Sequence, residues 1–184
     1  WPVTERVMTI VLFERSAVKM HVEHARKSNY RWRRMTHDII ASLNGALASG
    51  LVRSFYPIDG NLIAFLRYGR IIGNLGTGVK DFVDIDSEYL LELDDPNQFP
   101  AVAMALSKEV ERRGWQTCLM RGIREFACTM AQGMAVQFDY VVREREAVHH
   151  IRHTPDGGIP ADLIHPLQPC QAYNMSVPCI RKPM

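Results

Sequence analysis

The hydrophobic positions near the start of the chain repeat at the spacing of amphipathic helices. Apolar residues recur every three or four positions from Val7 to Val18, which predicts a helix over Val3–Lys27. A second helix is predicted over Met35–Leu47, where a stripe of apolar residues would face a core: Ile39, Ile40, Leu43 and Leu47. Gly50 stands where this helix is expected to end, because glycine readily adopts the left-handed backbone of a helix terminus.

Between these helices lies a basic and aromatic segment, Tyr30–Arg34. Such a cluster could contact phosphate groups. We favour the alternative that it is the solvated start of a helix with Trp32 packed against the core, since long basic side chains keep their charges in water.

From Asn61 onward the sequence pattern changes to short apolar runs separated by glycines. Leu62–Leu66 has the composition of a buried strand. Phe82–Asp86 alternates apolar and acidic residues, Glu88–Leu93 continues in strand-like fashion, and Asp94–Pro96 predicts a turn.

The second half of the chain predicts one further helix and several strands. The helix spans Phe99–Arg113 and ends at Gly114. Three strands come after it, separated by short turns: Trp115–Met120, Glu125–Thr129 and Ala135–Val142. Beyond Arg143 the chain is predicted to be an irregular loop, so the whole pattern indicates an α+β fold.

Length and charge limit the classes of protein. With 184 residues the chain fits one domain. A net charge of +2, from 22 basic and 20 acidic side chains, gives no support for a nucleic-acid partner. No apolar run reaches the roughly 18 residues of a membrane span. Because the chain begins at Trp1, we expect a processed or shortened product, and the sequence does not decide its compartment.

The four cysteines leave two possibilities open. Cys118 and Cys128 could face each other across a hairpin, and Cys170 and Cys179 could close a small loop. Four reduced, half-buried thiols fit the sequence equally well. None of the four forms a CxxC pair, so a structural zinc site has little support.

Asp84 and Asp86 are the main candidates for chemistry. On a strand, residues two apart point to the same face and lie roughly 6.5–7 Å apart. Two such carboxylates repel each other, and a hard divalent cation bound by their oxygens removes the conflict. The alternative is that one acid caps a turn and the other is solvated.

A third acid, Asp139, lies in the middle of the apolar segment Val136–Val141. An unpaired buried carboxylate is costly, so we expect it to have a partner. A metal ion shared with Asp84 and Asp86 and a hydrogen bond to backbone or arginine are equally good partners.

The histidines give weaker signals. His149, His150 and His153 could ligate a transition metal, but we favour an exposed loop. His21 and His24 are similarly interpreted as a surface pair on a helix. His165 lies in the segment Ile164–Cys170 and is the histidine of most interest.

Three segments resemble the LicD/fukutin family of phosphotransferases. Tyr68–Gly73 resembles the family's YGTLLG segment, and Phe82–Asp86 resembles its DDDID segment. Ile164–Cys170, which contains His165, together with Val177–Pro178 is similar to the family's FPL and VP segments. These matches stand in the family's order and extend over roughly residues 35–179.

The resemblance implies a nucleotidyltransferase fold. It would be one domain over residues 1–184, with a mixed sheet flanked by helices. Two N-terminal helices would occupy residues 3–50, and the catalytic core would occupy 61–143. A loop-rich segment over 144–184 would stop before the family's usual C-terminal portion.

The resemblance also implies a metal-dependent transfer of a phosphocholine or polyol phosphate group from a CDP-linked donor to a glycan hydroxyl. Asp84 and Asp86 would hold Mg²⁺ or Mn²⁺, with Asp139 as a third ligand or as the base that takes the acceptor proton. Gly69, Arg70 and Gly73 would contact the donor phosphates. The expected compartment is the secretory lumen in a eukaryote and the cytoplasm in a bacterium.

The chain departs from the family pattern at several positions. Arg70 replaces a hydroxyl residue, Gly76 replaces a basic residue, and Phe82 and Val83 replace the first two acids of DDDID. Two alternatives therefore remain. One is a diverged, non-catalytic nucleotide- or glycan-binding member of the same fold. The other is a glycosyltransferase whose DxD motif binds a metal–nucleotide-sugar.

Overall fold

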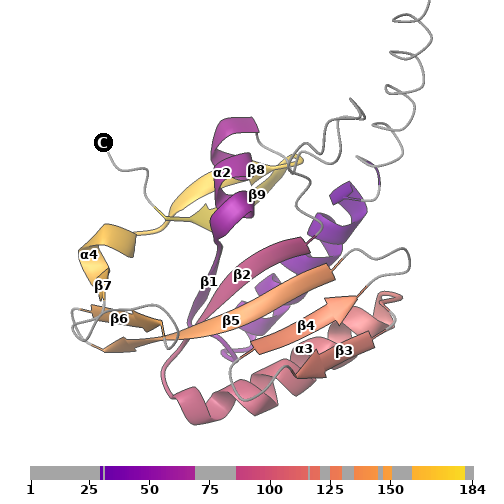
Figure 1. Ribbon diagram of the computed structural model, residues 1–184, viewed down its shortest axis with the longest axis horizontal. Helices are drawn as coiled ribbons and strands as arrows, with labels where there is room; N and C mark the ends of the chain where they lie inside the picture. The colour runs from indigo at the N-terminus through magenta and orange to yellow at the C-terminus, as the bar shows by residue number, and fades with distance from the viewer. Residues whose placement is uncertain are drawn as a thin grey trace, which may run out of the picture.

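A mixed seven-stranded sheet forms the centre of the protein in the computed structural model (Figure 1). The structure describes residues 30, 32–68, 86–115, 117–120, 125–129, 135–144, 147–150 and 159–180. The main strand order is β1-β2-β5-β4-β3, and a second, two-stranded sheet contains β8 and β9. The α+β class is therefore confirmed. In these ranges, no helix combines the length and the apolar character needed to cross a membrane.

The first described helix covers residues 32–48 and confirms the predicted helix over Met35–Leu47. Met35, Ile39 and Leu43 are fully buried at helical spacing. Gly50, at φ 70°, adopts the left-handed conformation expected after a helix end.

The two ends of this helix test two further expectations. Trp32 is buried while Arg33 is exposed, so the packed-tryptophan interpretation of the basic segment is confirmed. Leu47 was expected to face the core, but it is 40% exposed, because it falls outside the buried stripe in the last turn. The predicted helix over Val3–Lys27 lies outside the described residues.

The predicted strand over Leu62–Leu66 is wrong: these residues belong to the helix α2, Asp59–Tyr68. Asn61 and Phe65 are buried four positions apart, whereas Ile63 and Leu66 are exposed. This is the one-sided burial of a helix, and a run of five apolar residues does not distinguish it from a buried strand.

The centre of the sheet is a parallel pair. Strand β2, Asp86–Leu93, runs parallel to β5, Ala135–Glu144. Strand β1, Ser54–Pro57, is antiparallel to β2 on the other side. The antiparallel strands β4, Glu125–Thr129, and β3, Thr117–Met120, continue the sheet beyond β5. The strand predictions over 88–93, 125–129 and 135–142 are confirmed.

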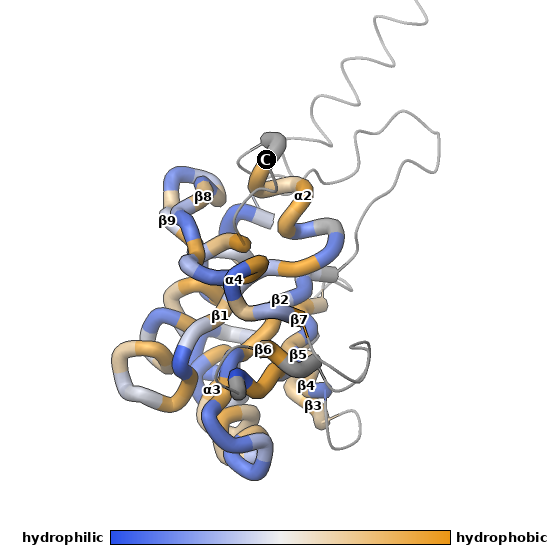
Figure 2. Tube along the Cα trace, turned by 90° about the vertical axis from the view of Figure 1, so that its left-hand side faces the viewer, coloured by the Kyte–Doolittle hydropathy of each residue, from blue (hydrophilic) through white to orange (hydrophobic). Residues whose placement is uncertain are grey.

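Helix α3, Phe99–Arg112, comes after the predicted turn and agrees with the predicted helix. A short 3₁₀ turn, Pro96–Gln98, leads into α3, and the Asp95 carboxylate accepts a hydrogen bond from the Asn97 amide at 2.9 Å. Gly114, at φ 93°, follows the end of α3. Figure 2 shows hydrophilic and hydrophobic stretches alternating along α3, as expected for a helix with one buried side.

The two faces of the sheet have different environments. Alternate residues of β2 and β5 enter the main core with the helix over residues 32–48 and α3: Tyr89, Leu91, Leu93, Val136, Phe138, Tyr140 and Val142. The opposite face forms a smaller cluster in which Tyr56 and Val141 pack with Ala161 and Ile164. This second face also carries buried polar residues, among them Glu92 and Asp139.

The expectation of an irregular loop beyond Arg143 is wrong where the structure describes strands, and residues 145–146 and 151–158 lie outside the described residues. Strand β6, Ala147–His150, pairs with the last residues of β5. Strand β7, Ile159–Pro160, pairs with β6 and leads into α4, Ala161–Ile164. The physical reason is that β5 continues past β4 to Glu144, which leaves an edge for β6 to occupy.

The chain then forms a hairpin of β8, Gln168–Ala172, and β9, Met175–Cys179. Tyr173 and Asn174 connect the strands with φ values of 52° and 76°. Two consecutive positive φ angles are the signature of a type I′ turn, which asparagine tolerates well.

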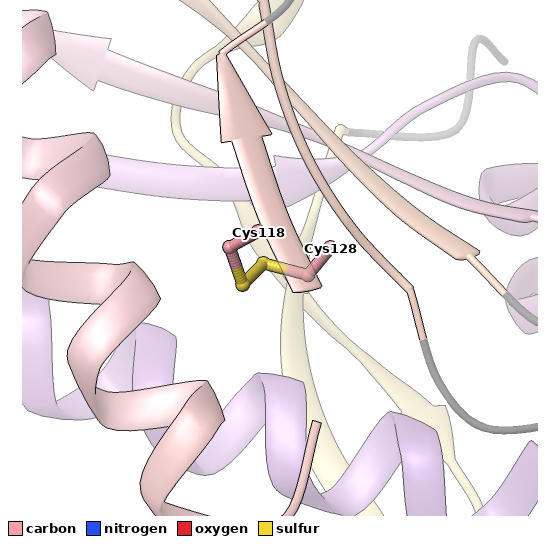
Figure 3. Close-up of a disulfide and its surroundings, with 2 residues drawn as sticks. All are labelled: Cys118 and Cys128. Carbon is pink, nitrogen blue, oxygen red and sulfur yellow. A yellow bond between two sulfur atoms is a disulfide. The ribbon is translucent and has the colours of Figure 1, made fainter. Parts of the chain in front are cut away.

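Both cysteine pairs are disulfide-bonded, which decides between the possibilities that the sequence left open. Cys118 of β3 and Cys128 of β4 are direct cross-strand partners with Cα atoms 4.0 Å apart (Figure 3). Cys170 and Cys179 link β8 to β9 with Cα atoms 5.8 Å apart. Each bond therefore closes one local hairpin.

Candidate functional site

The predicted site residues lie partly inside and partly outside the described residues. Asp84, Gly69, Arg70 and Gly73 fall outside them, so their proposed roles stay predictions. Asp86 is the first residue of β2, and its backbone pairs with Ala135. Asp139 lies in the middle of β5.

The pairing of β2 with β5 places the two acid-bearing strands side by side, as the idea of a shared site requires. The register, however, aligns Asp86 with Ala135 and Asp139 with Leu90. Four residues therefore separate the two acids along the sheet, which is about 13 Å at the rise of a strand.

This separation is too long for one ion. Two oxygen ligands of one Mg²⁺ lie at most about 4 Å apart. An aspartate oxygen is three bonds, or roughly 3.5 Å, from its Cα. Two aspartates around one ion thus span about 11 Å between Cα atoms. The register argues against Asp139 as a third ligand beside Asp86 and leaves the second predicted role, that of a proton acceptor.

Asp139 lies in an acidic stretch of the second sheet face. It is 7% exposed, and its direct cross-strand partner in β4 is Glu125, which is 8% exposed. Like charges placed opposite each other destabilise a sheet unless nearby groups compensate. Both residues take part in further polar interactions. Asp139 and Glu125 therefore form a buried acidic pair on the second sheet face.

The stretch extends toward the start of β2. Glu88 pairs with Gln137, and both side chains are half-buried on the same face as Asp139. Neither Glu88 nor Glu125 was predicted as a site residue from the sequence. The available signal was the continued alternation of acids at positions 84, 86 and 88, which a strand places on one face.

Helix α2 is anchored to the start of β2. The Asn61 side-chain amide donates a hydrogen bond to the Ser87 hydroxyl and a longer one, of 3.5 Å, to the Glu88 carbonyl oxygen. Asn61 and Ser87 are both buried. The chain leaves α2 at Tyr68 and enters β2 at Asp86. The segment with Gly69, Arg70, Gly73 and Asp84 therefore connects two elements that are bonded to each other.

A metal centre at Asp84 and Asp86 stays a prediction from the sequence. Within the part of the chain that the structure describes, no three His, Cys, Asp or Glu side chains are grouped closely enough to hold an ion. The carboxylates of Asp84 and Asp86 do not belong to that part. Their oxygen donors fit a hard divalent cation by their chemistry.

Of the histidines, the structure brings His165 into a polar cluster. Its Nε2 lies 2.8 Å from Oε2 of the buried Glu92. His149 and His150 belong to β6 and not to a loop, which corrects the expectation for both. His21, His24 and His153 lie outside the described residues.

Comparison with known proteins does not place the chain in a family. No protein-family model matches the chain, and no curated protein matches it significantly. The described residues define an α+β domain with a central mixed sheet.

Proposed function

We propose that the chain is a metal-dependent transferase of the nucleotidyltransferase type. It would move a phosphorylated small group, of the phosphocholine or polyol phosphate kind, from a CDP-linked donor to a glycan hydroxyl. The observation that supports this proposal best is the parallel pairing of β2 with β5. It brings the strand that begins at Asp86 next to the strand with the buried Asp139, although the two segments are far apart in sequence.

The proposed roles depend on the positions of the acids. Asp84 and Asp86 would hold Mg²⁺ or Mn²⁺, which supplies positive charge at the donor phosphates when bound. The backbone at Gly69 and Gly73 would approach those phosphates, and the Arg70 guanidinium would pair with their oxygens.

Asp139 would serve the acceptor. The acceptor oxygen bonds to phosphorus, CMP leaves, and the acceptor proton passes to the Asp139 carboxylate. The spacing of about 13 Å along the strands leaves room for a phosphoryl group and an acceptor hydroxyl between the two acids. A proton acceptor fits this spacing better than a third metal ligand does.

A second candidate is a diverged member of the same fold that binds a nucleotide or glycan without catalysing transfer. Phe82 and Val83 at the positions of two family acids favour it. Both candidates predict binding of the nucleotide, but only the transferase releases CMP.

Release of CMP from CDP-choline and from CDP-ribitol, with Mg²⁺ and a glycan acceptor present, tests the proposal. We expect acceptor-dependent release that Asp84→Asn with Asp86→Asn abolishes. Because Asp139 would take the proton only during transfer, Asp139→Asn should lower kcat by about 10²-fold or more without changing CDP affinity.

The thermal midpoint with Mg²⁺ and CDP provides a second reading. If the proposal holds, ligand at a hundred times its dissociation constant stabilises the fold by about 2.7 kcal/mol. The double asparagine variant should lose that stabilisation. Stabilisation without CMP release would favour the non-catalytic candidate, and a response equal in wild type and double variant would refute the metal pair.

A further inference from the structure

A second polar cluster lies at the far end of β2 and contains Glu92, His165, Arg53 and Arg143. Glu92 is six residues from Asp86, about 20 Å along the strand. The cluster is therefore distant from the predicted metal pair but adjoins Asp139, which pairs with Leu90, two residues or about 7 Å before Glu92 on the same sheet face. Phosphate binding by the cluster can be tested without the transfer reaction.

The topology explains why these residues meet. Glu92 lies near the carboxyl end of β2, and Arg143 lies near the carboxyl end of the parallel β5. Arg53 comes just before β1, which is antiparallel to β2, and its amide donates to the Glu92 carbonyl oxygen at 2.8 Å. All three residues therefore lie at the same end of the sheet, where β2 and β5 end and β1 begins. His165 directly follows α4, which packs on the second face of the sheet.

Glu92 is the buried centre of the cluster. Its side chain is fully buried, and its Oε2 lies 2.8 Å from Nε2 of His165. Its Oε1 lies 3.7 Å from a guanidinium nitrogen of Arg53 and 3.7 Å from one of Arg143. These are ion pairs beyond hydrogen-bond distance, and Oε1 has no hydrogen-bond partner among the described residues.

The positively charged groups around Glu92 are partly open to solvent. The side chains of Arg53, Arg143 and His165 are 47%, 28% and 15% exposed. Arg143 makes no hydrogen bond with its guanidinium group to any residue in the described ranges. The hydrogen bond of His165 to Glu92 uses Nε2, and Nδ1 has no hydrogen-bond partner in those ranges.

Charge within the cluster is balanced. Arg53 also pairs with Asp94 at 2.9 Å, so the two guanidinium groups face the two carboxylates of Glu92 and Asp94. The carboxylate of Glu92 is buried beneath its partners, and a ligand from solvent meets the nitrogens first. Glu92 thus contacts all three partners and holds them at the same end of the sheet.

We propose that Arg53, Arg143 and His165 form a binding site for a phosphate group. Planar guanidinium groups donate two parallel hydrogen bonds to phosphate oxygens, and a half-buried arginine loses little additional freedom on binding. The carboxyl ends of parallel strands are also where open sheets commonly bind ligands. The ligand class is a phosphate monoester or inorganic phosphate, which share the tetrahedral dianion.

Isothermal titration with inorganic phosphate tests this site, with sodium chloride keeping the ionic strength constant. Wild type should bind phosphate saturably at millimolar concentrations. Arg143→Gln should weaken binding about tenfold or more, because it removes charged hydrogen bonds. Arg33→Gln, which changes an exposed arginine on the helix over residues 32–48, should leave the affinity within about twofold.

Arg143→Lys provides a variant that keeps the charge next to Glu92 if Arg143→Gln fails to fold. It should also weaken phosphate binding, because an ammonium group lacks the planar pair of donors. Glucose 6-phosphate and acetate distinguish the ligand sources: a monoester site binds the former, a free-phosphate site excludes it by size, and acetate binds to neither.

Four results would overturn the proposal. They are the absence of saturable phosphate binding to wild type, a folded Arg143 variant within tenfold of wild-type affinity, an equal loss in Arg33→Gln, and acetate binding as tight as phosphate.

Discussion

The buried Tyr56 carries a hydroxyl group without a hydrogen-bond partner in the described part of the chain. Its ring packs beneath α4 in the smaller cluster of the second sheet face. Burial raises the pKa of Tyr56 far above its ordinary value, and the negative charge of Glu92 raises it further. Burial also raises the pKa of Tyr89 in the main core.

Tyr56→Phe should therefore leave the free energy of unfolding unchanged or raise it slightly at neutral pH. Removing an unpaired buried hydroxyl avoids a desolvation penalty of about 1–3 kcal/mol, against a small loss of packing. Urea denaturation measures the effect, and Tyr30→Phe is the matched control at a side chain that is 69% exposed. A loss above about 1 kcal/mol at Tyr56 alone would mean that the hydroxyl has a partner.

The same tyrosine makes stability depend on alkaline pH. Tyrosine in the unfolded chain ionises near its usual pKa of about 10, whereas folded Tyr56 stays neutral because its pKa is raised. The unfolded state then binds fewer protons, so stability is fully present below that pH and falls as the pH rises above it.

The slope should be about 1.4 kcal/mol per pH unit for each such tyrosine. Between pH 10 and 11 the unfolded tyrosine is only partly ionised, so Tyr56→Phe should make the slope shallower by about 1 kcal/mol per pH unit, whereas Tyr30→Phe should not change it. Denaturant titrations at several pH values measure both slopes. Identical slopes in wild type and Tyr56→Phe would contradict the burial argument.

At the residue scale, the burial of charge could not be predicted from the sequence. Glu92 follows two leucines in a strand, and no local pattern shows that its side chain is fully buried. Its partners come from three other segments of the chain, so the cluster exists only after the sheet and α4 have assembled. His165 was singled out because of its segment, and its contact with Glu92 was not foreseeable.

At the scale of the elements, each hairpin that ends in a cysteine pair is stabilised by its own disulfide. The bond between Cys170 and Cys179 closes a loop of about ten residues, for which chain entropy gives about 2–3 kcal/mol. Cys170→Ala with Cys179→Ala should lower the free energy of unfolding by that amount. The double variant Cys118→Ala with Cys128→Ala should behave similarly, because its loop is almost as short.

Urea denaturation with and without a reductant measures these contributions. Wild type should lose stability when reduced, and each double variant should lose less on reduction than wild type does. An unfolding midpoint that the reductant leaves unchanged in wild type would contradict both bonds.

The spacing of apolar residues predicted the elements that bury one side and that end at a glycine or a turn. The helix over residues 32–48 and α3 both have an apolar stripe and a terminal glycine. Strands β4 and β5 were found because turns separate them from their neighbours. Helix α2 was mistaken for a strand because five consecutive apolar residues carry no period. Strand β6 was missed because its existence depends on the free edge of β5, which is a tertiary property.

At the scale of the whole molecule, the candidate site depends on a contact between distant segments. From the sequence we predict that Asp84 and Asp86 bind a metal ion and that the strand with Asp139 lies beside their strand. The sequence suggested that these strands meet, and β2 and β5 are indeed neighbours in the sheet. It could not supply the register, which depends on how the whole of β2 packs against β5 and the core. That register favours the second of the two roles expected for Asp139, the proton acceptor.

The same parallel pair has a consequence for the rate at which the protein folds. Asp86 pairs with Ala135, whereas Glu125 pairs with Asp139 after a much shorter excursion of the chain. Closing a long loop costs conformational entropy before any contact compensates for it, so distant pairings form slowly. We therefore expect the β3-β4-β5 meander to assemble early, with β2 joining it in the slow step.

Pulse-labelled hydrogen exchange during refolding, with disulfides intact, checks this order. Amides of β4 should become protected before those of β2. Protection of β2 in the same phase as β4 would show that the parallel pair forms together with the meander. The late joining strand is the one that carries Asp86 and Glu92, so both polar regions of the protein would be completed in the last step of folding.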